Sequence, residues 1–372
     1  MNFSLFLLVC LGEWLMIICT RDVVHKSSRC HSRRHSSRRL FKANEIEDME
    51  SFNKKLERHF ATTDSITADE WMKALPTREE IHEIKSLIGL LFTYDTFENF
   101  EPFVVLSAFP QLLPYVEITI ISTDYCVVHE KLQNRYYSTL FPRFWGYVAI
   151  ASKRHASRAN LHHSAAHFQT DGEVCAQAAA IFRRTRSRSL VVAGASRYAV
   201  HGKTESTCQR HTALADAAHN NATMFHAMNL AIFEVSRQHN FDEDTFIQWH
   251  GMASITCGDI VVFGSAGVNG SNTVYAREFS PINRIIDTLN NALGGSYAGT
   301  PATAHCRLKA TTNVFGRVIN GVPVTEACTK SIDKISVLGQ FVHLEQKSWI
   351  GNDWDLWTRV IKSAFSIQHE CK

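Results

Sequence analysis

Short, continuously apolar runs alternate with helical patterns from about residue 103 to the end of the chain. A run that is apolar at every position is typical of a strand covered on both faces. Strands alternating with helices favour an α/β fold, and we predict a mixed, mostly parallel sheet with helices on both faces. The predicted strands are residues 103–108, 116–122, 145–152, 189–196, 245–251, 259–265 and 335–345, and the predicted helices are residues 173–185, 222–237, 281–293 and 353–365.

The composition is that of a folded globular protein. The 372 residues are 45% hydrophobic and 20% charged, which excludes a disordered chain, a collagen-like repeat and a polytopic membrane protein. The formal net charge of +3 is too small to indicate nucleic acid by itself, and we expect no nucleic-acid partner. The 19 histidines are numerous enough to make metal chemistry worth testing.

The N-terminal region predicts export. Residues 1–19 resemble a signal peptide or hydrophobic leader, although Glu13 interrupts the apolar run and no Lys or Arg precedes it. We expect a secreted protein with no stable membrane span after leader removal, and a signal anchor is the alternative. Residues 20–42 predict a basic disordered linker, residues 43–100 a helical N-terminal extension, and residues 101–372 a hydrolase-like catalytic domain. A capping box at Thr77 and Glu80 marks the start of one helix in the extension.

The cysteines agree with export. Eight of the ten remain after the leader, and none forms a Cys-x-x-Cys motif, which argues against a zinc ribbon or a thioredoxin motif. Widely spaced cysteines in a secreted chain favour disulfides, with the pairing left open. The sequons at Asn221 and Asn269 permit N-glycosylation.

Three histidines and a carboxylate, His162, His163, His167 and Asp171, lie within ten residues just before the helix predicted at 173. Neutral imidazole and carboxylate are common zinc ligands, and a loop between a strand and a helix can bring such residues to one ion. Ligands in α/β sheets bind beyond the carboxyl ends of the strands, where this cluster is expected. The alternatives are a polar surface loop for the histidines and a helix cap for Asp171.

Two further strands end in residues of the same kind. His250 ends the strand predicted at 245–251, and its alternative is a buried histidine bonded to backbone. The strand predicted at 335–345 ends in His343-Leu-Glu345, and strand alternation puts His343 and Glu345 on one face. A carboxylate beside a metal-bound water can act as general base and then as general acid, which suggests that role for Glu345.

Substrate binding is predicted for three other residues. Arg197 follows the strand at 189–196, and its guanidinium suits a substrate carboxylate because it forms two parallel hydrogen bonds. Its alternative is a surface ion pair. Asp216 and His219 form an Asp-x-x-His pattern ahead of a helix, which we assign to a substrate loop or to the support of metal ligands.

The order of these residues resembles the zinc carboxypeptidase-like amidohydrolases, including the poly-γ-glutamate hydrolase and N-formylglutamate amidohydrolase relatives. The resemblance covers roughly residues 145–345. It implies a phosphorylase/hydrolase-like fold and one Zn²⁺ held by two histidines and a carboxylate. The implied ligands are His163 or His167, with Asp171 and His250. It also implies that Arg197 binds a substrate carboxylate and that Glu345 moves the proton of the zinc-activated water.

These observations together predict a secreted, metal-dependent hydrolase of an amide or peptide-like bond. Its substrate would be a small-molecule or peptide-like compound with a carboxylate. A serine hydrolase or esterase is the first alternative, because Gly194-Ala-Ser196 follows an apolar strand, although Tyr198 stands where the nucleophile turn needs glycine. A non-catalytic secreted binding protein on the same fold is the second.

Overall fold

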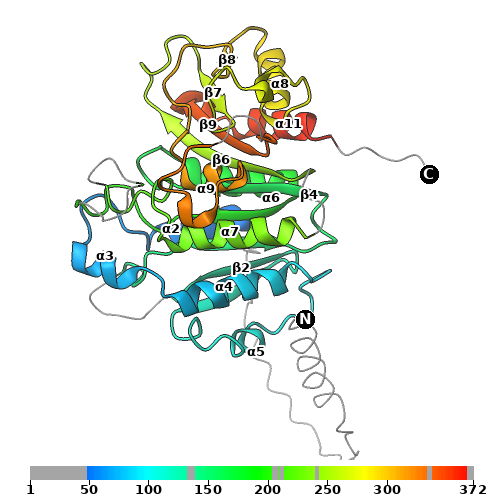
Figure 1. Cartoon of the computed structure of the whole chain (residues 1–372). Helices are drawn as coiled ribbons and strands as arrows, with labels where there is room; N and C mark the ends of the chain where they lie inside the picture. Colours follow the sequence, from blue (N-terminus) through cyan, green and yellow to red (C-terminus); the bar gives the residue numbers. More distant parts are fainter. Residues whose placement is uncertain are drawn as a thin grey trace, which may run out of the picture. The chain divides into compact units, whose positions relative to one another are not determined.

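The structure is a computed structural model, shown in Figure 1. It describes residues 48–131, 139–202, 208, 213–238, 243–332 and 337–366. The leader predicted at 1–19 and the linker predicted at 20–42 lie outside the described residues. No helix in the described part of the chain is long and apolar enough to cross a membrane.

A mixed sheet forms the centre of the protein, which confirms the predicted fold class. Nine strands of the described residues lie in the order β1-β2-β3-β5-β4-β6-β9-β7-β8. The four strands β5, β4, β6 and β9 run parallel, β1 to β3 form an antiparallel ribbon beside β5, and β7 is antiparallel to β9. The strands are β1 (Val116–Ile121), β2 (Tyr125–Glu130), β3 (Tyr147–Ala151), β4 (Arg158–Ala165), β5 (Ser187–Val192), β6 (Thr245–Met252), β7 (Val262–Ser265), β8 (Ala298–Gly299) and β9 (Phe341–Lys347).

Helices cover both faces of the sheet, as predicted. Helices α2, α6, α8 and α11 share one core with the sheet, and α4, α5, α7 and α9 share a second core on the opposite face. Figure 1 shows α4 and α7 side by side across one face. The helices are α2 (Met49–Glu57), α3 (Ala68–Ala74), α4 (Arg78–Leu91), α5 (Pro102–Leu106), α6 (Val174–Thr185), α7 (Met224–Ser236), α8 (Pro281–Leu293), α9 (Val314–Ile319), α10 (Ser348–Gly351) and α11 (Trp354–Ala364), with 3₁₀ turns at Thr273–Ala276 and Val324–Glu326.

Capping boxes begin the helices that precede the sheet. At α4 the Thr77 side chain accepts from the Glu80 backbone N–H and the Glu80 carboxylate accepts from the Thr77 N–H, as the sequence predicts. The same reciprocal pair begins α2 and α3. Met49, Phe52 and Leu56 of α2 are buried in the core that α6 and α11 share with the sheet. Helix α2 therefore packs directly on the sheet.

Several elements differ from the sequence prediction. Residues 103–108 form no strand, because Pro102 begins the short helix α5 there. The strand predicted from 335 begins at Phe341, after Gly339 turns the chain with a φ of 87°. Strands β2 and β4 were not predicted, since both bury polar side chains that break an apolar pattern.

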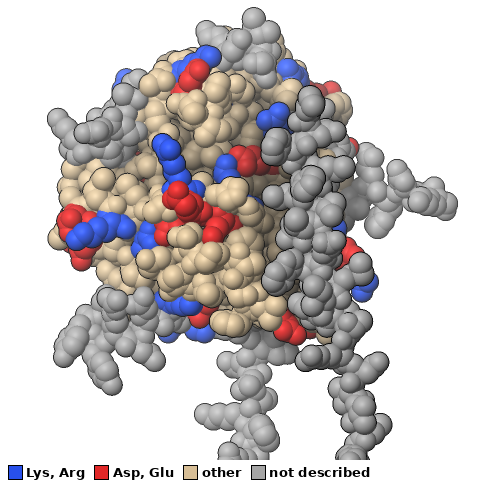
Figure 2. Space-filling view, turned by 60° about the horizontal axis from the view of Figure 1, so that its bottom comes forward, with Lys and Arg blue, Asp and Glu red and all other residues tan. Residues whose placement is uncertain are grey.

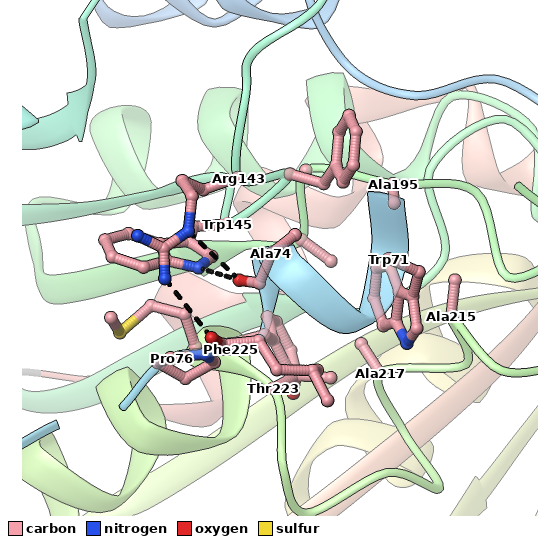
Figure 3. A pocket seen from close by; sticks show the side chains of 15 residues that line it. Trp71, Ala74, Pro76, Arg143, Trp145, Ala195, Ala215, Ala217, Thr223 and Phe225 are labelled. Carbon is pink, nitrogen blue, oxygen red and sulfur yellow. Dashed lines mark hydrogen bonds between the residues drawn. The ribbon is translucent and has the colours of Figure 1, made fainter. Parts of the chain in front are cut away.

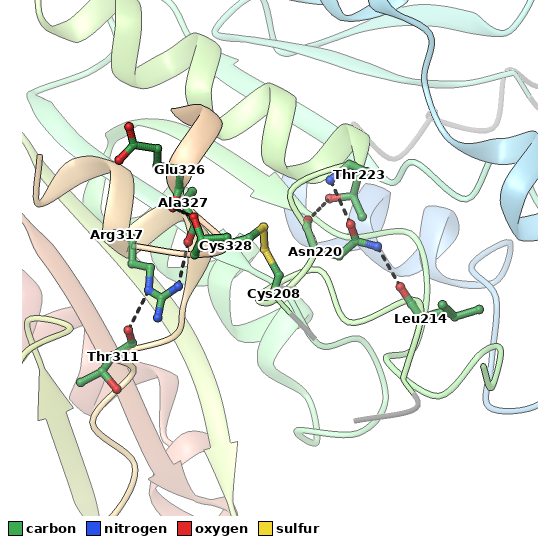
Figure 4. Close-up of a disulfide and its surroundings, with 11 residues drawn as sticks. Cys208, Leu214, Asn220, Thr223, Thr311, Arg317, Glu326, Ala327 and Cys328 are labelled. Carbon is green, nitrogen blue, oxygen red and sulfur yellow. Dashed lines mark hydrogen bonds between the residues drawn. A yellow bond between two sulfur atoms is a disulfide. The ribbon is translucent and has the colours of Figure 1, made fainter. Parts of the chain in front are cut away.

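Two disulfides tie the loops of the protein, Cys208–Cys328 and Cys257–Cys306. Figure 4 shows the first beside Arg317, whose guanidinium donates to the carbonyls of Thr311 and Ala327. Among the described residues Cys126 and Cys175 are buried free thiols. Two disulfides are consistent with an extracellular protein.

Candidate metal and catalytic site

The carboxyl ends of three neighbouring parallel strands carry the candidate site. His167 follows β4 by two residues, His250 lies near the end of β6, and Glu345 near the end of β9. Asp171 comes from the turn between β4 and α6. Because β4, β6 and β9 run parallel and adjacent, these side chains meet at one edge of the sheet.

Two imidazoles and one carboxylate converge there. The Nδ1 atom of His167 lies 2.9 Å from Oδ2 of Asp171, and Nδ1 of His250 lies 3.1 Å from the same oxygen. The two Nδ1 atoms are 3.0 Å apart. His167, Asp171 and His250 thus present three buried ligand atoms close enough to share one metal ion, and two nitrogens with one oxygen are a donor set that zinc takes.

The ring nitrogen of each histidine that faces away from the cluster is hydrogen-bonded to another side chain. Nε2 of His167 lies 2.9 Å from Oδ1 of Asp216, and Nε2 of His250 lies 2.9 Å from Oε1 of Gln248. Such partners fix the orientation of ligand imidazoles. The Gly251 N–H donates to Oδ2 of Asp171, and a Cβ at Gly251 would lie 2.4 Å from the Asp171 carbonyl oxygen, so this close approach requires glycine.

The charges of the site shift its pKa values. Burial lowers the pKa of His167, but Asp171 and Asp216 outweigh burial and raise it to about 9. Burial raises the pKa of Asp171 and of Asp216, yet the imidazole of His167 holds both well below their usual value. Burial lowers the pKa of His250 to about 4, so this ring is neutral and free to bind a metal.

Glu345 lies one strand from His250 and is paired with it across the ladder between β6 and β9. It is buried, and burial followed by the charge of Asp171 raises the pKa of its carboxyl to about 8. A carboxylate with a raised pKa suits proton transfer near neutral pH. The His343 ring stacks on His250 with centroids 4.2 Å apart, and the groups of His250, His343 and Glu345 are also close enough for one ion.

Arg197 and His219 border the cluster. The Arg197 guanidinium donates to Oδ1 of Asp171 at 3.0 Å and contacts Nδ1 of His167, so the structure pairs it with a protein carboxylate. Nδ1 of His219 lies 3.2 Å from Oδ2 of Asp216, and its side chain is partly exposed. Asp171 does not cap α6, because its oxygens face the histidines and Arg197, and the α6 N-cap Glu173 makes no side-chain cap bond.

The structure does not bring His163 to this cluster. His163 lies inside β4, where its Nε2 lies 2.9 Å from Oγ of Ser187 and its Nδ1 accepts from Trp249. Trp249 precedes His250 on β6, and successive strand residues face opposite sides of a sheet. His163 therefore lies on the face away from His250, and its two ring nitrogens are already bonded. Of the two expected alternatives, the geometry favours His167.

Ser196 is not paired with an imidazole among the described residues. Its hydroxyl lies 3.2 Å from that of Thr63 and accepts from the Tyr198 N–H. The side chain is fully buried. The serine-hydrolase alternative requires a base within hydrogen-bond range of this hydroxyl, and the described residues supply none.

Gln248 and Asn313 were not predicted. Asn313 donates to Oε1 of Gln248, which also faces His250. A polar residue two positions before His250 on the same strand face is a signal that would have identified Gln248. No local pattern identifies Asn313.

A separate small cavity of about 20 Å³ lies between the end of α3, the segments before β3 and after β5, and the start of α7, and Figure 3 shows its lining. Trp71, Ala74, Trp145 and Phe225 line it, and the Trp145 indole donates to the Ala74 carbonyl. Arg143 beside it pairs with Glu80 at 2.8 Å. The space is that of about one water molecule, and no predicted site residue lines it. This cavity reflects how the N-terminal helices pack.

No protein-family model matches the chain, and no curated protein matches it. One solved structure resembles it, a crystal structure from Shewanella denitrificans OS-217 named "Putative carboxypeptidase A". The likeness covers 74% of this chain and 69% of that chain, with 12% identity and a TM-score of 0.32. A likeness this weak assigns neither a family nor an activity.

Proposed function

We propose that this protein is a secreted, metal-dependent hydrolase of an amide or peptide-like bond. The observation that carries the proposal is the convergence of His167, Asp171 and His250, whose ligand atoms lie about 3 Å from one another. Glu345 lies on the adjacent strand on the same sheet face as His250. The two disulfides support the extracellular part of the proposal.

The residues present fit a divalent ion. Both histidines have Nδ1 toward the cluster and Nε2 toward a protein acceptor, Asp216 or Gln248. This arrangement is common around zinc, where the outer partner sets the tautomer. We favour Zn²⁺, which would be held by His167, Asp171 and His250, because its sites combine imidazole and carboxylate. A bound divalent ion supplies Lewis acidity, which lowers the pKa of water and polarises a carbonyl.

The other residues have separate roles in the proposed reaction. Glu345 takes a proton from the attacking water and returns it to the leaving nitrogen. Arg197, which donates to Asp171 in the structure, binds the substrate carboxylate, and His219, which pairs with Asp216, contacts the substrate beside it. Asp216 positions His167 and makes no substrate contact in this scheme. The substrate is therefore a small molecule or peptide-like compound with a carboxylate near the bond cleaved.

Metal content of the purified protein tests the metal part. We expect about one zinc per chain after loading and dialysis, and loss of that zinc in His250→Ala. His226→Leu is the matched control, since His226 is equally buried but lies on α7, outside the cluster. A folded wild-type protein that binds no zinc, or equal loss in both variants, would overturn the metal centre. Binding of zinc without hydrolysis of any amide, peptide or ester in a broad screen would favour the binding-protein alternative.

A further inference from the structure

A basic hollow of about 500 Å³ lies between two loops outside the metal cluster. One loop follows β6 and contains Thr256 and Cys257, and the other follows β8 and contains Cys306. The second loop also contributes His305, Arg307 and Lys309 to the lining. None of these residues belongs to the proposed metal or catalytic site.

Basic side chains line the hollow, and no acidic side chain in its lining neutralises them. No Asp or Glu lines it, and the described residues supply no ion pair to Arg307 or Lys309. In contrast, on the face shown in Figure 2, Lys and Arg side chains lie beside Asp and Glu side chains. Like charges held together in a concave surface create a local positive potential that attracts anions.

The walls of the hollow are held by specific bonds. The disulfide Cys257–Cys306 joins the two loops directly. The Ser265 hydroxyl at the end of β7 donates to the Lys309 carbonyl at 2.7 Å. The basic side chains therefore project from one loop that a disulfide and a hydrogen bond to the sheet hold in place, so less ordering is needed when a ligand binds.

We propose that this basic hollow binds an acidic segment of a polypeptide. The Arg307 guanidinium matches a carboxylate with two parallel hydrogen bonds, and Lys309 offers a second charge at the same wall. A nucleic acid fits less well, because no Phe, Tyr or Trp lines the hollow for base stacking and the cations are few. The proposal concerns binding, and it does not depend on hydrolysis.

Fluorescence anisotropy with a labelled octaglutamate peptide tests this on the full chain, with octaglutamine as the neutral probe. The protein is first treated with a chelator, so that binding to a metal is excluded. We expect octaglutamate to bind, salt to weaken the binding, and octaglutamine not to bind. The double variant R307Q/K309Q should bind more weakly, by up to about 30-fold, since each of the two exposed charge pairs contributes at most about 1 kcal/mol.

The matched control is R359Q/K362Q, which removes the same two kinds of charge from the exposed side of α11. It should retain the wild-type affinity within about twofold. No wild-type binding, or equal loss in both double variants, would overturn the proposal. Unlabelled competitors test the choice of ligand. If single-stranded DNA or a sulfated polysaccharide displaces the labelled peptide better than unlabelled acidic peptide does, the choice of an acidic peptide is wrong. The zinc content is measured separately and tests the proposed metal site. Either proposal can therefore be refuted without affecting the other.

Discussion

The carboxylate behind His167 provides the sharpest test of the metal centre. Asp216 accepts from Nε2 of His167 at 2.9 Å and from the Ala218 N–H at 3.2 Å, while its other oxygen faces His219. In Asp216→Asn the side chain keeps its shape and loses its charge. We expect the zinc affinity to fall. A neutral partner behind the imidazole makes His167 a weaker electron-pair donor to the metal.

The expected loss can be estimated. Removing a partner behind a metal-bound histidine costs about 10- to 100-fold in metal affinity, or about 1.4 to 3 kcal/mol. Asp216 is buried, so water replaces the lost charge poorly and the upper part of that range applies. The stoichiometry at saturating zinc should stay near one, because Asp216 is not itself a ligand in this scheme.

Competition against a zinc-selective chelating dye at constant pH measures this affinity. The control is Asp244→Asn, which removes a buried carboxylate 3.6 Å from Nε2 of His162, a histidine outside the cluster. The control should bind zinc as the wild type does. An Asp216→Asn protein with wild-type affinity would refute the assignment of His167 as a ligand, and so would an equal loss in Asp244→Asn.

Two further predictions concern other groups. Glu345→Gln should keep the zinc content and lower kcat by about 100- to 10,000-fold, because the amide cannot take a proton; loss of zinc together with activity would instead make Glu345 a ligand. His226 is buried with neither ring nitrogen bonded among the described residues, and burial lowers its pKa from 6.5 to about 4. Since the unfolded chain takes up the proton first, the native protein should lose about 3 kcal/mol of stability from this group as pH falls from 6.5 to 4. His226→Leu should remove that loss. The variant's free energy of unfolding in urea, relative to the wild type, should therefore increase as the pH falls. An equal difference between the two proteins at pH 7.5 and pH 4.5 would contradict the prediction.

The local sequence pattern determined most of the sheet and its helices. Apolar runs located β1, β3, β5, β6 and β7, and helical periodicity located α4, α6, α7, α8 and α11, with a capping box at the start of α4. The alternation of these strands and helices was enough to predict the fold class. Strands that helices cover on both faces must be apolar at nearly every position, and such runs are visible in the sequence. The positions of His250 and Glu345 at strand ends followed from the same pattern.

Strands β2 and β4 escaped prediction because their polar residues are satisfied by distant partners. The carboxylate of Glu130 in β2 accepts from the N–H groups of Arg143 and Trp145. His162 and His163 in β4 face serines of β5. A pattern of hydrophobicity treats such residues as loop residues, since only the folded chain shows that their hydrogen bonds are made.

The choice among the clustered histidines also depended on tertiary structure. Residue spacing allows either His163 or His167 to reach Asp171, but the register of β4 against β6 turns His163 toward Trp249 and leaves His167 beside His250. The pairing of His167 with Asp216, 49 residues away, arises in the same way. Local sequence determines which segments become strands and helices through periodicity, whereas the packing of those segments decides which polar side chains meet, because a metal site joins residues that no local periodicity relates.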